Sequence, residues 1–225
     1  MAAPIILGLS LLIPAPAPAA PAGSTGADVE RVLVVGDSLS AEYGLQRGQG
    51  WAALLQARLH DAGSRAQVIN ASISGDTTAG GVQRLPSLLE QHEPQLVLIE
   101  LGANDALRGL PLTQTRRNLE RMIALCKKAS AHVVLIGIQV PPNYGPQYTQ
   151  ELAQLYADLA HAERVGLVPF LLHGVADVPN ARRWFQSDGL HPIAQAEPLM
   201  LDNVWKVVGP ILAPSARRAA PRRKQ

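Results

Sequence analysis

Residues 31–40 read RVLVVGDSLS, a β-branched apolar run that passes directly into a polar, turn-forming segment. Near-continuous apolar runs of this length are typical of strands that are covered on both faces of a parallel sheet. The same pattern returns as LVLIEL and HVVLIGI further along the chain, and two weaker runs accompany it. The predicted strands are 31–35, 67–70, 96–101, 132–138 and 167–168.

Amphipathic stretches separate these strands. In four of them apolar residues recur three and four positions apart, which is the spacing of a helix with one buried face. Alternating strands and helices predict an α/β protein with a parallel sheet and right-handed crossovers. Functional sites in such sheets form beyond the carboxyl ends of the strands. The apolar stripes are Trp51, Leu54, Leu55 and Leu59; Leu119, Met122, Ile123 and Cys126; Leu152, Leu155, Tyr156 and Leu159; and Met200, Val204, Val207, Val208 and Ile211.

The composition excludes several classes of protein. Of the 225 residues 47% are hydrophobic and 17% are charged, which allows a sizeable core and excludes wholesale disorder. The net charge is +2, and five cations lie within 213–225, so the rest of the chain has 15 cations against 18 acids. This balance excludes a domain-wide nucleic-acid footprint. Cys126 is the only cysteine, so neither an internal disulfide nor a CxxC site can form.

The two ends of the chain are expected to lie outside the folded domain. Residues 1–22 carry no charge and contain the apolar run Ile5–Ile13, followed by Pro/Ala-rich sequence. This run is too short to span a bilayer, which needs about 20 apolar residues, but it matches the core of a secretory signal peptide. We expect a signal peptide or disordered leader at 1–22, a linker at 23–30, one domain at 31–212 and a basic tail at 213–225. Export would place the protein in the periplasm or outside the cell, although no Lys or Arg precedes the apolar run.

Polar residues follow the predicted strands, as this topology requires of an enzyme. Ser38 comes directly after the first strand, and a serine hydroxyl becomes a strong nucleophile only when a base removes its proton. Asp188 and His191 lie three residues apart around Gly189, so the carboxylate can accept a hydrogen bond from the imidazole Nδ1–H. Nε2 of His191 would then face Ser38 as the base. The predicted catalytic residues are Ser38, Asp188 and His191.

Loops after three different strands offer hydrogen-bond donors for an oxyanion. Each donor placed in advance around a tetrahedral intermediate is worth roughly 3 kcal/mol. Gly75 lacks a Cβ and can bring its backbone N–H close, Asn104 offers its side-chain NH₂, and Ser38 offers its own backbone N–H. Asp37 is expected to stabilise the first loop by accepting backbone N–H bonds, and Asp105 is expected to be structural.

These motifs, in this order, resemble the four sequence blocks of the GDSL, or SGNH, hydrolase superfamily. Further stretches at 100–109 and 142–145 resemble a bacterial subgroup of multifunctional esterases with thioesterase, protease, lysophospholipase and arylesterase activity. The resemblance covers about residues 31–211. The blocks are GDSLS at 36–40, Gly75 in NASISGDT, GAND at 102–105 and DGLH at 188–191.

The resemblance implies a flavodoxin-like three-layer α/β/α sandwich with a five-stranded parallel sheet in the order 2-1-3-4-5. It implies the same catalytic roles for Ser38, Asp188 and His191 and the same oxyanion donors. The implied activity is hydrolysis of carboxylic esters and thioesters, including aryl esters, acyl-CoA and lysophospholipids, through an acyl-enzyme on Ser38. We expect a monomer with small-molecule acyl esters, thioesters or lysolipids as partners. No metal or cofactor is expected, because the sequence contains no HExxH, no P-loop and no metal-like histidine spacing.

Apolar side chains after the third and fourth strands are expected to line a groove for the acyl chain. Two alternatives stay open. A carbohydrate O-deacetylase would have a small pocket and would reject long acyl chains, whereas a non-catalytic flavodoxin-like binding module would keep the fold without turnover. The predicted substrate-binding residues are Leu107, Leu110, Pro142 and Tyr144.

Overall fold

The computed structural model describes residues 31–140 and 144–212. The expectations for 1–22, 23–30, 213–225 and Pro142 lie outside these described residues. Within the described ranges no helix is both long and apolar enough to cross a membrane.

A five-stranded sheet forms the centre of the domain, with its strands in the order β2-β1-β3-β4-β5 and every neighbouring pair parallel. The predicted parallel sheet and its strand order are confirmed. Two strands end earlier than their apolar runs predict, because the chain turns there into the polar loops. The strands are β1 (Arg31–Gly36), β2 (Gln67–Asn70), β3 (Leu96–Glu100), β4 (His132–Ile136) and β5 (Gly166–Val168).

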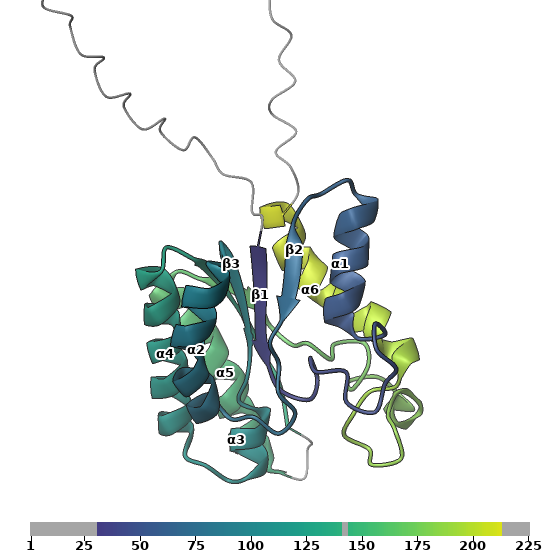
Figure 1. Ribbon diagram of the computed structural model, residues 1–225. Helices are drawn as coiled ribbons and strands as arrows, with labels where there is room; N and C mark the ends of the chain where they lie inside the picture. Colours follow the sequence, from purple (N-terminus) through teal and green to yellow (C-terminus); the bar gives the residue numbers. More distant parts are fainter. Residues whose placement is uncertain (1–30, 141–143, 213–225) are drawn as a thin grey trace, which may run out of the picture.

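Helices cover both faces of the sheet, which gives the three layers visible in Figure 1. Alternate residues of each strand point into two separate apolar clusters, so Leu33 and Val35 pack against one helical layer while Val32 and Val34 pack against the other. One layer contains α2 (Thr78–His92), α4 (Leu112–Lys128) and α5 (Pro146–Glu163), and the other contains α1 (Trp51–Asp61) and α6 (Glu197–Leu212). The short elements are α3 (Ala103–Leu107), η2 (Ala181–Trp184) and η3 (Ala194–Ala196).

The four apolar stripes lie on α1, α4, α5 and α6, with one exception at the last position. Ile211 is 38% exposed, so its predicted place on the buried face is wrong. Helix α2 is not among the predicted helices, because Gly80, Gly81 and Pro86 are poor helix formers. It begins at a capping residue, Thr77, whose side chain accepts a hydrogen bond from the Gly80 N–H.

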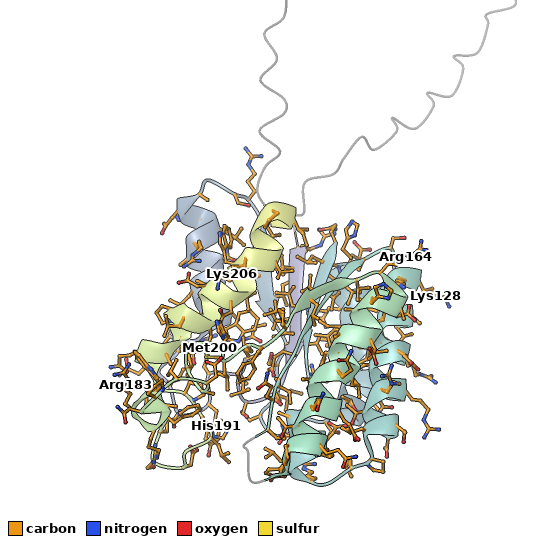
Figure 2. The ribbon with its side chains drawn as sticks, turned by 180° about the vertical axis from the view of Figure 1, so that it is seen from behind. Lys128, Arg164, Arg183, His191, Met200 and Lys206 are labelled. Atoms are coloured by element: carbon orange, nitrogen blue, oxygen red, sulfur yellow. The ribbon has the colours of Figure 1, made fainter. Side chains whose placement is uncertain are left out.

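The described domain begins and ends at the same end of the sheet. β1 starts at Arg31 and α6 stops at Leu212, both beside the amino-terminal ends of the strands (Figure 1). The loops that follow the strands gather at the opposite end. Figure 2 shows His191 at that end and Arg164 and Lys128 at the other.

Candidate active site

A hydrogen-bonded line of three side chains lies at the carboxyl edge of the sheet. Ser38 is in the turn directly after β1, and its Oγ lies 2.9 Å from Nε2 of His191. Nδ1 of the same imidazole lies 2.7 Å from Oδ2 of Asp188. With the proton on Nδ1, the ring donates to Asp188 and presents an unprotonated Nε2 to the serine hydroxyl. The structure thus brings together the three residues predicted as catalytic, although 153 positions separate Ser38 from His191.

The turn around Gly189 holds the carboxylate of Asp188 in place. Gly189 has a φ of +72°, which glycine adopts without the strain that a Cβ would add. Oδ1 of Asp188 accepts from the backbone N–H of Leu190 at 2.9 Å and of His191 at 3.1 Å. The hydrogen bond from the His191 ring, followed by that from the Leu190 N–H, lowers the pKa of Asp188 to about 2. This carboxylate therefore stays ionised over the whole neutral range.

The loop that carries His191 also contacts the loop that carries Ser38. No sequence motif indicates these contacts. The ring of Tyr43 lies over that of His191, with 4.2 Å between the ring centroids and 37° between the planes. Gln186 donates from Nε2 to the carbonyl oxygens of Tyr43 at 2.8 Å and Pro192 at 2.9 Å. We call these three contacts together the Tyr43–Gln186 clasp. It fixes the imidazole relative to the loop that carries Ser38.

The predicted oxyanion donors lie in turns at the same edge. Ile73 and Asp76 close a turn through an N–H···O bond of 3.1 Å, and Gly75 within it has a φ of +78°. Among the described residues, neither the Gly75 N–H nor the Ser38 N–H donates a hydrogen bond. The Asn104 amide donates one of its two N–H groups to Oδ2 of Asp37 at 3.0 Å, which leaves the second available.

Buried carboxyl groups organise the loops behind these donors. Asp37 is fully buried and accepts from the Leu39 N–H at 3.0 Å, as predicted for this residue. Asp105 accepts from the N–H and the hydroxyl of Thr78 and so satisfies the first turn of α2. Glu100 is also fully buried, beside Asp37. Sequence reasoning missed Glu100, although an acid inside the apolar run LVLIEL is itself an unusual signal.

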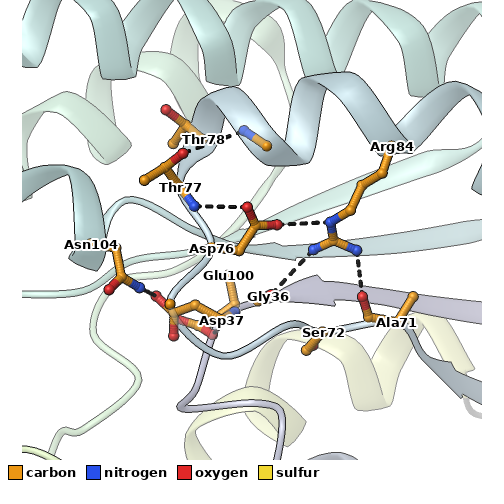
Figure 3. A network of polar contacts seen from close by, with 12 residues as sticks. Gly36, Asp37, Ala71, Ser72, Asp76, Thr77, Thr78, Arg84, Glu100 and Asn104 are labelled. Atoms are coloured by element: carbon orange, nitrogen blue, oxygen red, sulfur yellow. Dashed lines mark hydrogen bonds and ion pairs between the residues drawn. The ribbon is translucent and has the colours of Figure 1, made fainter.

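Arg84 ties the loops after β1 and β2 together from helix α2 (Figure 3). Its Nε donates to Oδ2 of Asp76 at 2.8 Å, and its two terminal nitrogens donate to the carbonyl oxygens of Gly36, at 3.2 Å, and Ala71. The side chain of Arg84 is 18% exposed and that of Asp76 is 12% exposed. One planar guanidinium therefore holds both loops, since its donors point in fixed directions.

Three of the predicted substrate-binding residues, Leu107, Leu110 and Tyr144, belong to the described part of the chain and follow β3 and β4 toward this edge. Leu107 on α3 and Tyr144 before α5 are each 37% exposed, and Leu110 is half-buried. A cavity of about 290 Å³ lies instead at the opposite end of the sheet, between Lys127, His132, Arg164 and Ile211. It is far from the chemistry, because His132 and Gly166 begin β4 and β5 there. Among the described residues no group of His, Cys, Asp and Glu side chains is arranged to hold a metal ion.

A serine, an imidazole and a carboxylate in line beside unpaired N–H donors form the arrangement of a serine hydrolase. The model of the GDSL-like lipase/acylhydrolase family matches residues 34–197, which contain most of the domain. The chain belongs to this family, and it is a hydrolase.

Several curated relatives are similar over most of their length. Esterase TesA of Pseudomonas aeruginosa is 50% identical over 186 residues, which are 83% of this chain and 91% of the relative. An arylesterase of Vibrio mimicus is 48% identical over 175 residues, or 78% of this chain and 86% of the relative. Thioesterase 1/protease 1/lysophospholipase L1 of Escherichia coli is 40% identical over 83% of this chain and 86% of its own length.

Solved structures agree with the fold. The crystal structure of TesA superposes with a TM-score of 0.78 at 50% identity and covers 81% of this chain and all of the other. The psychrotrophic esterase EstA from a Pseudoalteromonas species, in a form inhibited by monoethylphosphonate, gives a TM-score of 0.76 at 39% identity over 82% of this chain and all of its own.

Proposed function

We propose that this enzyme is a serine esterase that cleaves carboxylic esters and thioesters with apolar acyl chains through an acyl-enzyme on Ser38. The observation that carries the proposal is the continuous line from Ser38 Oγ through His191 to Asp188 beside free backbone N–H donors. A hydroxyl without such a base is a poor nucleophile, and a base without donors for the oxyanion would gain little.

The reaction follows from this line in two halves. Ser38 Oγ forms a bond to the carbonyl carbon while its proton passes to Nε2 of His191, and the Asp188 carboxylate stabilises the imidazolium. The carbonyl oxygen becomes an oxyanion against the N–H groups of Ser38, Gly75 and Asn104. The carbon then expels the alkoxide or thiolate, which takes the proton from His191. Water, deprotonated by the same imidazole, attacks the acyl-enzyme and frees the acid and the serine.

An apolar rim around this edge supports acyl chains as the substrate feature. We use "apolar rim" for five large side chains that are each at least 37% exposed, one in the loop region after each strand. Exposed apolar groups spread over separate loops but gathered at one edge are typical of a binding surface and not of random exposure. The rim consists of Tyr43, Ile73, Leu107, Tyr144 and Leu190.

The rim favours long acyl chains over the small acyl group of a carbohydrate O-deacetylase, which would need a small pocket. The relatives point the same way, because their names describe an esterase, an arylesterase and a thioesterase and lysophospholipase. Aryl esters, acyl thioesters and lysophospholipids are therefore the proposed substrates. A non-catalytic binding module is disfavoured, since it has no need of an aligned base.

Two measurements test the proposal. A series of p-nitrophenyl esters of increasing acyl length should show kcat/KM rising beyond acetate, whereas a steep fall after two carbons would support a deacetylase. Wild-type enzyme should release a burst of p-nitrophenol and take up a fluorophosphonate label, and Ser38→Ala should do neither while keeping its unfolding temperature. Labelling of Ser38→Ala would move the nucleophile elsewhere.

We further propose that the enzyme is exported, because 1–22 matches a signal peptide by composition and length. An exported enzyme would meet lysolipids and foreign esters more often than acyl-CoA. Fractionation of a Gram-negative host, followed by N-terminal sequencing of the mature chain, tests this. Retention of the full chain in the cytoplasm would contradict it.

A further inference from the structure

Two fully buried carboxyl groups lie next to each other, and one of them accepts a hydrogen bond from the oxyanion donor Asn104. Glu100 ends β3 and Asp37 follows β1, and the parallel register pairs Gly36 with Glu100. A Cβ at Gly36 would lie 2.8 Å from Oε2 of Glu100 and 2.7 Å from Oγ of Ser40. The carboxyl group of Glu100 thus occupies the space that the glycine leaves open.

Glu100 and Asp37 differ in how completely hydrogen-bond donors surround their carboxyl oxygens. Oε2 of Glu100 accepts from the Ser40 hydroxyl at 2.8 Å and from the Asp37 N–H at 3.3 Å, but its Oε1 is buried and no donor in the described part of the chain faces it. Asp37 accepts N–H bonds on both oxygens, from Leu39 and Asn104. The Asp37 N–H bond to Oε2 places the two carboxyl groups next to each other, so a proton on one of them allows a hydrogen bond to the other.

The proton belongs on Glu100. No lysine or arginine of the described residues forms an ion pair with either carboxyl, and two adjacent buried carboxylates would repel each other. Burial, and then the charge of Asp37, raises the pKa of Glu100 well above its usual range. Burial also raises the pKa of Asp37, to about 6, against the opposing effect of its N–H donors. Asp37 therefore ionises before Glu100, so above the pKa of Asp37 there is a range of pH in which the pair carries one negative charge. The other ionisable groups that interact with the pair are Tyr156 and His191.

The protonation of this pair affects the oxyanion site through Asn104, whose amide donates to Asp37. An ionised Asp37 can only accept, so it selects the NH₂ end of the Asn104 amide (Figure 3) and leaves the second N–H of that amide available to another acceptor. A second negative charge behind that amide would oppose the developing oxyanion.

We propose that Glu100 is a positioning residue: a neutral carboxylic acid that donates a hydrogen bond to the Asp37 carboxylate and through it holds the Asn104 amide toward the oxyanion. The proposal rests on the proposed function for its catalytic consequence, but the protonation of Glu100 is a property of the resting protein and can be measured without turnover.

Infrared difference spectroscopy at pH 8 tests the protonation. The wild type should show the C=O absorption of a protonated carboxyl, and Glu100→Gln should lack it. Glu197→Gln is the matched control, because Glu197 is a second buried glutamate and is only 2% exposed. Burial raises the pKa of Glu197 to about 7, so this carboxyl is mostly ionised at pH 8. Its substitution should leave the absorption in place. Identical wild-type and Glu100→Gln spectra would overturn the proposal.

Kinetics test the positioning role. Glu100→Gln keeps a donor toward Asp37 and should retain kcat within about threefold, whereas Glu100→Met has no donor and should lose at least about tenfold in kcat with a smaller change in KM. Equal activity in both variants, or a large kcat loss in Glu100→Gln, would overturn it. Should Glu100→Met not fold, Glu100→Gln and the infrared comparison decide. Absence of any p-nitrophenyl ester hydrolysis by the wild type would refute the proposed function and would leave the infrared result standing.

Discussion

Replacing Arg84 with methionine should weaken both the fold and the catalytic step, because this guanidinium joins the loops after β1 and β2. Methionine matches the length of the aliphatic part and removes the charge and the donors. The variant therefore tests the contacts of the guanidinium head and not the packing of its stem.

The expected loss of stability depends on which hydrogen bonds the partners of Arg84 retain in Arg84→Met. The Gly36 carbonyl still accepts from the Ile73 N–H at 3.0 Å, so its loss is small. Asp76 keeps the Thr77 N–H at 2.9 Å but loses its cation while 12% exposed. Breaking a buried ion pair by removing one partner costs about 3–5 kcal/mol, and the residual bond and exposure place this case near the lower figure. A loss of about 3 kcal/mol corresponds to a fall of roughly 6–12 °C in Tm for a domain of this size.

Activity should fall as well, because the released turn carries Gly75. Misplacing one oxyanion donor by about an ångström costs on the order of a hundredfold in rate, and the loss should appear in kcat more than in KM. Urea unfolding and p-nitrophenyl ester kinetics on the same preparation measure both effects.

Two further variants make the reasoning refutable. Arg84→Lys keeps a charge near Asp76 but not the planar set of donors, so it should fall between wild type and Arg84→Met. Adding Asp76→Asn to Arg84→Met removes the unpaired carboxylate and should recover part of the lost stability. A Tm within about 2 °C of wild type for Arg84→Met, with kcat unchanged, would show that the guanidinium does not hold these loops.

Three other substitutions give distinct outcomes. Asp188→Asn should lower kcat by about a thousandfold or more, because the imidazole loses the acceptor that sets its tautomer. Its effect on stability should be complete above the unfolded value of 3.8 and should disappear progressively as the pH falls from 3.8 through the folded pKa of about 2, where the stabilising charge is lost. Glu197→Gln should stabilise the protein at pH 8 by up to about 3 kcal/mol in urea unfolding. Burial raises the pKa of Glu197 from 4.5 to about 7, so ionisation of this carboxyl disfavours the folded state above that pH. The gain in stability should therefore vanish near pH 4.5. Gly102→Ala should cost about 2–4 kcal/mol in thermal unfolding, because φ is +127° there and a Cβ would overlap the Tyr156 hydroxyl. The same substitution in Tyr156→Phe should cost less, and an equal cost in both backgrounds would contradict the overlap.

The features that the sequence predicts well are those that depend on the pattern of neighbouring residues. The five strands and four amphipathic helices follow from hydrophobic periodicity, which repeats within each element. The line from Ser38 to His191 could be anticipated because parallel strands carry their following loops to one edge, so motifs far apart in sequence must meet there.

What the sequence does not predict depends on contacts between distant loops. The Tyr43–Gln186 clasp joins residues 143 positions apart, and neither residue lies in a recognisable motif. Glu100 belongs to an apolar run that reads simply as a strand, so its partner across the sheet is invisible until the register is known. Helix α2 is hidden by its glycines and proline, and its stability comes from packing on α4 and β1.

The position of Arg31 and Leu212 has a practical consequence. Both ends of the described domain lie at the pole of the molecule opposite to the Ser38 loop. A fusion partner, affinity handle or solid support attached directly at Arg31 or Leu212 would lie on the side opposite to the apolar rim and leave the rim accessible. Preparations immobilised at either of these two residues should thus keep access to bulky or aggregated esters.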